Sequence, residues 1–249
     1  MIILTTHGGL GNQLFQLLYG LALSSKTQEK LVVVHNARYQ HRFGLSPKFE
    51  HIQKGGQLSY LLSSCRLPKL LSRLSRTRIE KMRVGNWYIL DGYFQSVEDL
   101  QEFSEIDLVT ALSYLLNVYI SAEDATAGHL VHLRVHDHSS DIDAFGMFEA
   151  QLADLSSDTS LICNRDESLA RFLSGRDPNE VPIHIRTDAL SPDELLMLIM
   201  KYKKVTGPDS TLAAWASILS GNEYSIDKKT LGRVVAFLRD KVSMLRRQG

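Results

Sequence analysis

The sequence predicts an α/β protein in which two series of strands and helices each build a parallel sheet. Residues 2–5 and 31–34 are apolar, β-branched runs of the kind that form buried strands. Between them, apolar residues recur at helical spacing over residues 14–22. A strand, a helix and a strand of this length indicate a βαβ unit, whose strands are parallel. A second series of the same kind begins near Gly128.

The other expected elements follow from the same patterns. In the first series, residues 87–90 predict a strand, and residues 97–103 and 107–119 predict helices. Residues 36–85 are basic with short leucine-rich pieces, which favour helical and irregular structure. In the second series we expect strands at 130–133, 161–163, 181–185 and 204–206, and helices at 145–155, 167–173, 191–200, 211–219 and 228–247.

One helix start is especially clear. Ser191 can cap the helix, Pro192 suits its first position, and Glu194 completes a capping box. The boundary between the two series lies near residues 121–128. We therefore expect two facing Rossmann-like lobes with a cleft between them, formed by residues 1–125 and 126–249. One larger doubly wound sheet is the alternative.

Composition excludes several classes of protein. The 249 residues, 44% of them apolar, suffice for one large core or two small ones. Lys and Arg number 28, as do Asp and Glu, and zero net charge argues against a general nucleic-acid-binding protein. The two cysteines suggest neither a disulfide framework nor a zinc site. Without a membrane-spanning stretch or a signal peptide, the protein is expected to be cytoplasmic.

A glycine-rich turn, His-Gly-Gly-Leu-Gly-Asn-Gln-Leu-Phe-Gln at residues 7–16, joins the first strand to the first helix. The backbone N–H groups at such a helix start can bind an anion or a polar ligand. Leu14 occupies the place of the third glycine of the dinucleotide fingerprint, and no Lys-Ser/Thr pair completes a P-loop. A tight packing turn capped by Asn12 is the alternative to a ligand-binding role.

A polar segment follows the strand at 130–133. It contains His132, Arg134, His136, Asp137 and His138. Ligands of open α/β sheets bind beyond the carboxyl ends of the strands, and an arginine there can hold a phosphate through two hydrogen bonds. A surface loop with an Arg134–Asp137 ion pair is the plainer interpretation. A metal-dependent hydrolase built on His132, His136, His138 and Asp141 is a further alternative.

A third segment, residues 207–215, lies between a strand and a helix. Ser210 and Thr211 could bind phosphate oxygens with their hydroxyls and with the amides of the helix start. Ordinary helix capping explains the same residues and is favoured when the segment is considered alone.

Together these segments resemble the α-1,2-fucosyltransferase family of bacterial polysaccharide synthesis, from residue 3 to about residue 219. The resemblance rests on five segments in the family's order: residues 8–16, 91–96 (Asp-Gly-Tyr-Phe-Gln-Ser), 132–137, 193–197 and 210–215. It implies a GT-B arrangement of two lobes and an inverting transfer of fucose from GDP-β-L-fucose to a glycan hydroxyl, without a required metal or other cofactor.

The resemblance also implies roles for particular residues. Arg134 matches the arginine that contacts the diphosphate, with His132 in support and Asp137 or His136 as a base. Ser210, Thr211 and Leu212 match the segment that closes around the donor, and Asp166 is the candidate acid for the base or ribose. Gly11, Asn12 and Gln13 would line the acceptor side of the cleft.

The chain departs from the family pattern in three places. Val135 and His136 replace an Arg and a Gly, and the segment before Asp166 is only weakly matched. In the segment at 210–215, Leu212, Ala213 and Ala214 replace Phe, Ser and Trp, so the stacking Phe and one Trp are absent. These changes allow a different GDP-deoxyhexose, or a degenerate homologue that binds nucleotide or glycan without turnover. The acceptor, an oligosaccharide or lipid-linked glycan, is not specified.

A group of basic residues could contact anionic lipid or a pyrophosphate-linked acceptor at the inner face of the membrane. A solvated helical face is the favoured interpretation. The group consists of Lys69, Arg73, Arg76, Arg78, Lys81 and Arg83.

Overall fold

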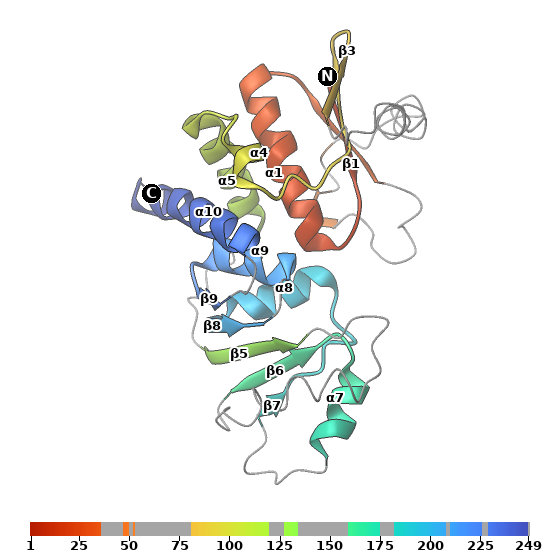
Figure 1. Cartoon of the computed structure of the whole chain (residues 1–249), viewed down its shortest axis with the longest axis vertical. Coiled ribbons are helices and arrows are strands. Elements are labelled where there is room, and N and C mark those ends of the chain that lie inside the picture. Colours follow the sequence, from red (N-terminus) through yellow and green to blue (C-terminus); the bar gives the residue numbers. More distant parts are fainter. Residues whose placement is uncertain are drawn as a thin grey trace. The chain divides into compact units, whose positions relative to one another are not determined.

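The computed structural model of the chain divides into two compact units (Figure 1). It describes residues 1–35, 47–49, 52, 81–119, 127–133, 159–174, 182–207, 210–225 and 229–248. The first unit comprises Met1–Ile120 and Arg233–Gly249, and the second comprises Ser121–Gly232. The C-terminal residues thus group with the first unit, whereas the sequence division assigns them to the second lobe.

The first unit contains a four-stranded sheet in the order β2-β1-β4-β3. Its strands are β1 (Ile2–Thr6), β2 (Leu31–His35), β3 (Lys81–Val84) and β4 (Trp87–Leu90). Strand β1 pairs in parallel with both β2 and β4, and β3 is an antiparallel edge strand. The central strand β1 is buried throughout, which accounts for its continuous run of apolar and β-branched residues.

Helices supply much of the core of the first unit, and the first of them packs directly against the sheet. They are α1 (Leu10–Thr27), α4 (Val97–Leu100), α5 (Glu105–Tyr119) and α10 (Lys229–Gln248), besides the short 3₁₀ helix η2 (Pro47–Phe49). From α1, Leu14, Phe15, Leu17 and Leu18 are fully buried at helical spacing. Two ion pairs attach α10: Arg233 to Glu98 at 3.3 Å and Lys241 to Glu105 at 2.6 Å.

The second unit contains a parallel five-stranded sheet in the order β7-β6-β5-β8-β9. Its strands are β5 (Ala127–Leu133), β6 (Ser160–Cys163), β7 (Ile183–His184), β8 (Tyr202–Thr206) and β9 (Glu223–Ser225), and its helices are α7 (Asp166–Leu173), α8 (Pro192–Met200) and α9 (Thr211–Ser220). Counted along this unit, the order is 3-2-1-4-5, that of a doubly wound nucleotide-binding sheet.

Most of the expected elements are confirmed. The α/β class and the two separate series are correct, and the single larger sheet is wrong because β1–β4 and β5–β9 form two sheets. The capping box at the start of α8 is present, with Ser191 and Glu194 each accepting from the other's backbone N–H. The helix expected at 145–155 lies outside the described residues, and the cleft between the lobes stays a prediction.

Three expectations need correction. Residues 81–84, expected to be helical or irregular, form β3, whose exposed edge position permits basic side chains that hide the strand pattern. The helix expected at 97–103 ends at Leu100, where α4 stops after one turn. Strand β9 was not expected, because only three residues, two of them exposed, form it.

Gly207 lies where the carboxyl ends of β5 and β8 approach each other closely. A Cβ atom at Gly207 would lie 2.5 Å from the carbonyl oxygen of His132, a backbone atom that a rotamer change cannot move. We expect Gly207→Ala to lower the free energy of unfolding by about 1–3 kcal/mol, as in other overpacked sites. Urea denaturation would measure the loss.

Gly128→Ala is the matched control, because no atom lies within 4 Å of an added Cβ there. Its stability should be unchanged or slightly raised, since alanine restricts the unfolded chain. Equal stabilities of the two variants would show that the ends of β5 and β8 do not constrain Gly207.

Candidate functional site

The order of the strands marks one position in the sheet of the second unit. The chain runs from β5 outward to β6 and β7 and then returns across the sheet to β8 and β9. The switch point therefore lies between β5 and β8. In open parallel sheets, ligands bind outside the carboxyl ends of the strands at such a point.

The segments singled out from the sequence meet at this edge. His132, at the end of β5, is buried with 7% of its surface exposed, and Gly207 follows the end of the neighbouring β8 in contact with it. Arg134 and Asp137 follow His132 directly but lie outside the described residues, as do His136, His138 and Asp141. The ends of β5 and β8 are therefore neighbours in the structure, and Arg134 lies outside the described residues.

The start of α9 also lies at this edge. Ser210 is the N-cap, and its Oγ accepts a hydrogen bond from the Ala213 N–H at 3.4 Å. Ser210 is buried, whereas Thr211 and Leu212 are half-buried. The capping interpretation of Ser210 is therefore confirmed, and Thr211 has more surface available for a ligand. A donor role for these three residues stays a prediction.

Of the three departures in α9, Leu212 is half-buried and the two alanines lie in the core. Ala213 and Ala214 are both fully buried, as is the Trp215 side chain. These alanines pack against the interior of the second unit. Their difference from the family pattern therefore concerns core packing in this unit.

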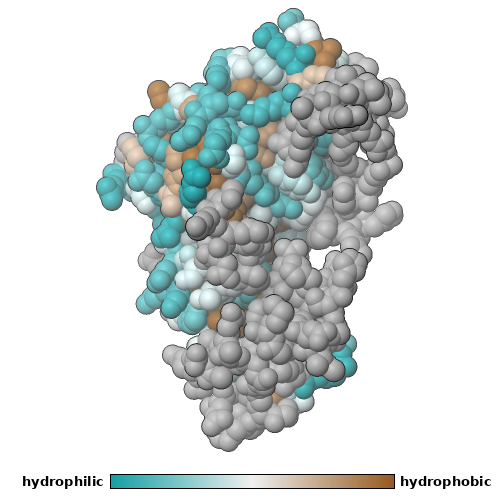
Figure 2. Space-filling model, viewed as in Figure 1, coloured by the Kyte–Doolittle hydropathy of each residue, from teal (hydrophilic) through white to brown (hydrophobic). Residues whose placement is uncertain are grey.

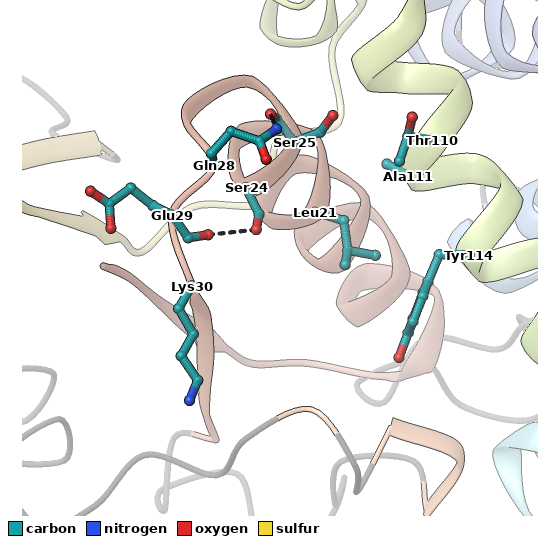
Figure 3. A pocket seen from close by; sticks show the side chains of 9 residues that line it. All are labelled: Leu21, Ser24, Ser25, Gln28, Glu29, Lys30, Thr110, Ala111 and Tyr114. Atoms are coloured by element: carbon teal, nitrogen blue, oxygen red, sulfur yellow. Dashed lines mark hydrogen bonds between the residues drawn. The ribbon is translucent and has the colours of Figure 1, made fainter.

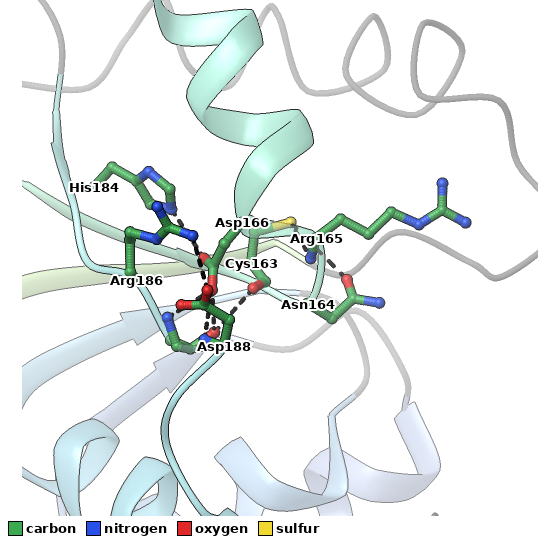
Figure 4. A network of polar contacts seen from close by, with 8 residues as sticks. Cys163, Asn164, Arg165, Asp166, His184, Arg186 and Asp188 are labelled. Atoms are coloured by element: carbon green, nitrogen blue, oxygen red, sulfur yellow. Dashed lines mark hydrogen bonds and ion pairs between the residues drawn. The ribbon is translucent and has the colours of Figure 1, made fainter.

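Asp166, at the start of α7, lies at the centre of a hydrogen-bond network after β6 (Figure 4). Its Oδ1 lies 2.9 Å from Nε2 of His184. Its Oδ2 accepts from the Thr187 N–H at 2.6 Å, the Thr187 hydroxyl at 3.0 Å and the Asp188 N–H at 2.8 Å. Both oxygens are thus bonded within the protein, and the carboxylate fixes the chain that follows β7.

An exposed ion pair borders this network. Arg186 donates from Nη2 to Oδ2 of Asp188 at 2.7 Å, and Figure 4 shows both side chains beside Asp166. The hydrogen bond from Arg186 holds the pKa of the Asp188 carboxyl below its usual range. Because both side chains are more than half exposed, the pair contributes little to stability.

The first sheet has a switch point of its own, between β1 and β4. From β1 the chain passes through α1 to β2 on one side, and β4 pairs with the other side of β1. The segments at residues 7–16 and 91–96 follow the carboxyl ends of these two strands. The sheet thus brings together two segments that are about eighty residues apart in the chain.

Polar contacts join these two segments. Gln95 Nε2 donates to Oδ1 of Asn12 at 2.9 Å, which links the two segments. Within the first segment, Gln13 Nε2 donates to the Gly8 carbonyl at 2.9 Å.

The turn before α1 requires a glycine. Gly8 has a φ of +79°, and a Cβ there would lie 2.7 Å from the side-chain nitrogen of Asn12. The N-cap of α1 is Gly9, so the expectation that Asn12 caps this helix is wrong.

His7 and Asp91 are titratable groups of this edge that sequence reasoning missed. Nδ1 of His7 lies 3.8 Å from Oδ1 of Asp91, and both side chains are about nine-tenths buried. The ring of Tyr93 meets the His7 ring edge-on, with centroids 4.5 Å apart. One sequence feature could have identified them: each residue directly follows a buried strand, where ligand-contacting side chains gather in α/β folds.

A separate surface pocket of about 490 Å³ lies beside the C-terminal end of α1 (Figure 3). Its lining includes Ser24, Glu29, Lys30 and Tyr114, and burial raises the pKa of the Tyr114 phenol. Lys30 precedes β2, so the pocket lies at the amino ends of the parallel strands. This is the edge opposite to that of His7 and Asp91, and ligand sites of such sheets are not found there.

Three further observations concern the described residues. They contain no group of three or more His, Cys, Asp or Glu side chains that could hold a metal ion. None of the helices they form is long and apolar enough to cross a membrane. On the face drawn in Figure 2, the described surface is mostly hydrophilic, with hydrophobic residues in small groups.

Of the basic group at residues 69–83, two members lie in the described part. Lys81 pairs with Glu102 at 2.9 Å and with Asp99 at 3.6 Å, and Arg83 lies over the Tyr88 ring. Both therefore have contacts within the first unit, Lys81 with the α4 region and Arg83 with β4. Lys69, Arg73, Arg76 and Arg78 lie outside the described residues.

The fold and these edges define an α/β protein of two units, each with a switch point lined by polar residues. No protein-family model matches the chain, and a search of curated proteins finds no match. Among solved structures it is similar to the α-1,6-fucosyltransferase NodZ crystallised with GDP, with a TM-score of 0.46, 14% identity, and coverage of 88% of this chain and 91% of that chain.

Two other solved structures are also similar. The fucosyltransferase NodZ from Bradyrhizobium has a TM-score of 0.45 and 14% identity, over 88% of this chain and 92% of that chain. The iron-containing dodecameric glycosyltransferase TibC from enterotoxigenic E. coli has a TM-score of 0.41 and 14% identity. That likeness covers 90% of this chain and 57% of TibC.

Proposed function

We propose that the chain is an inverting glycosyltransferase that moves L-fucose, or a related deoxyhexose, from a GDP-sugar to a hydroxyl of a glycan acceptor in surface polysaccharide synthesis. The observation that carries the proposal is the 3-2-1-4-5 sheet of the second unit. Residues that follow β5 and β8 at its switch point are those in which the sequence resembles α-1,2-fucosyltransferases. A nucleotide diphosphate is the ligand that such an edge suits best.

In the proposed reaction the acceptor oxygen attacks the anomeric carbon as the bond from that carbon to the diphosphate breaks. The negative charge that develops on the leaving GDP needs a fixed positive partner. Arg134 supplies it, because a guanidinium stays charged and can bond two phosphate oxygens at once. Thr211 and the amides at the start of α9 bind further oxygens. The transfer requires no metal in this scheme.

The donor class is tested by thermal unfolding in the presence of GDP, UDP and ADP. We expect GDP to raise the melting temperature and the others to leave it nearly unchanged. At a hundredfold excess over Kd the stabilisation is about 2.7 kcal/mol, or roughly 5–10 °C for a chain of this size. Stabilisation by UDP alone, or by no nucleotide, would contradict the proposal.

Turnover separates the transferase from a homologue that only binds. The assay measures GDP released from GDP-fucose, with water and with a panel of oligosaccharide acceptors. A transferase should release GDP faster with an acceptor than with water. Tight GDP-fucose binding without release of GDP under any condition would favour the degenerate homologue.

A further inference from the structure

The carboxyl edge of the first sheet holds a histidine and an aspartate that the proposed transfer does not yet use. His7 leaves the end of β1 and Asp91 leaves the end of the neighbouring parallel strand β4. The two residues therefore flank the switch point of this sheet, the position at which α/β sheets gather ligand-contacting groups. Both side chains are about nine-tenths buried, and Nδ1 of His7 lies 3.8 Å from Oδ1 of Asp91, close enough for an ion pair once the ring is protonated.

We propose that His7 is the general base of the transfer: it accepts the proton of the acceptor hydroxyl, while the Asp91 carboxylate orients the ring and stabilises its protonated form. The inference rests on the proposed function. It deepens that function by assigning proton removal to the first unit, whereas Asp137 and His136, the bases suggested by the sequence, belong to the second.

Chemistry favours His7 over its neighbours at this edge. Asn12, Gln13 and Gln95 carry amides, which can bond sugar hydroxyls but cannot take up a proton at neutral pH. An imidazole changes charge between about pH 5 and 8, so the neutral ring is available as a base under physiological conditions. A neighbouring carboxylate favours the protonated ring, as in other base–orienter pairs.

The position of the ring is set by its surroundings. The backbone N–H of His7 donates to Oε1 of the fully buried Gln16 at 3.1 Å. The side-chain nitrogen of Gln16 lies 3.4 Å from each nitrogen of the His7 ring. The titratable groups that face His7 are the Asp91 carboxylate and the Tyr93 phenol, both from the segment after β4. A base held by several contacts loses little entropy in the reaction.

The segment that carries Asp91 is held in an unusual backbone conformation. Phe94 has a φ of +50°, the left-handed region that bulky residues rarely adopt. Its ring is buried and stacks on Tyr19 with centroids 4.1 Å apart. Residues held in this way cluster at active sites, where packing elsewhere compensates for the strain.

In the proposed transfer, every bond, electron pair and proton has a defined destination. The acceptor oxygen forms its bond to the anomeric carbon, and the bond from that carbon to the diphosphate oxygen breaks with its electron pair leaving on GDP. The acceptor proton passes to His7, which becomes an imidazolium beside the Asp91 carboxylate. Release of that proton to water returns the neutral ring for the next cycle.

The test measures GDP released from GDP-fucose with water as the acceptor, over a range of pH. The wild-type rate should fall as the pH is lowered, because the base becomes protonated. His7→Ala should lower the rate about 10²–10⁴-fold and should bind GDP-fucose as the wild type does. Added imidazole should restore part of the lost rate in proportion to its concentration.

Arg134→Ala is the matched inactive control. Its rate should fall because the leaving GDP loses its positive partner, and imidazole should not restore that rate. Asp91→Asn provides a second variant: its rate should be lower and its acid limb should move to lower pH, because a neutral amide no longer favours the protonated ring. If His7→Ala does not fold, the test of the inference is the pH dependence of the GDP release rate in the wild type and in Asp91→Asn. A wild-type rate without an acid limb would overturn the inference.

The failures of the two proposals are distinguishable. If the wild type binds GDP-fucose and releases GDP while His7→Ala keeps a near-normal rate, the inference alone is wrong. A slow His7→Ala that binds GDP-fucose but gains nothing from imidazole would equally overturn it and leave the transferase proposal intact. If the wild type does not bind GDP-fucose, both proposals fall.

Discussion

Arg134→Ala should lower the rate of fucose transfer by about a hundredfold to a thousandfold, the usual loss when a preorganised group that stabilises developing charge is removed. In the sequence the residue directly follows Leu133, the last residue of β5, and the end of β5 lies at the switch point of the second sheet. The charge on GDP grows as the sugar bond breaks, so the effect should fall mainly on kcat. GDP release from GDP-fucose under saturating donor measures it.

Arg134→Lys separates charge from geometry. A lysine keeps the positive charge but bonds phosphate from a single point, so its rate should lie between those of the wild type and of Arg134→Ala. Thermal unfolding without nucleotide should be the same for all three proteins. A near-normal rate for Arg134→Ala would exclude this arginine as the partner of the diphosphate.

The elements predicted best are those whose local pattern and tertiary role agree. Strands β1 and β4 are apolar because the sheet buries them, and α8 begins where Ser191 and Glu194 form their reciprocal cap. By contrast, β3 is basic because one of its edges faces solvent, and its pairing with β4 depends on a turn at Gly85. Periodicity detects burial, so exposed edge strands escape it.

The candidate site was predictable only in part, because a site is made by contacts across the chain. The sequence marks both the turn at residues 7–16 and the segment at 91–96, but their meeting depends on β1 and β4 becoming neighbours. The pairing of Gln95 with Asn12 and of His7 with Asp91 follows from that register. No spacing within either segment indicates it.

Asp166 illustrates the opposite case, in which the position was found from the sequence and the structure adds contacts that the sequence does not indicate, while a donor role stays a prediction. The sequence suggests an acid that contacts the donor base or ribose. The structure instead shows both oxygens bonded to the segment from His184 to Asp188. A carboxylate so occupied acts through the chain that it holds in place at the carboxyl edge of the second sheet.

Asp166→Ala should therefore destabilise the protein by about 3 kcal/mol, because the change removes a buried carboxylate and leaves partly buried donors without their acceptor. The donors are the His184 ring and the N–H groups of Thr187 and Asp188, whereas the Thr187 hydroxyl also reaches the Cys163 carbonyl at 3.1 Å. For a chain of this size the melting temperature should fall by roughly 6–12 °C. Urea denaturation without nucleotide, followed by circular dichroism, measures the loss.

Asp188→Ala is the control, since it removes a carboxylate from the same segment. Asp188 is more than half exposed and pairs with the exposed Arg186, so its loss should leave the stability nearly unchanged. A nucleotide-contacting Asp166 would give a different pattern: GDP affinity would fall while stability without nucleotide stayed near that of the wild type. Because four donors converge on this one buried carboxylate, we expect the loss of stability, with any change in GDP affinity following from the loosened edge.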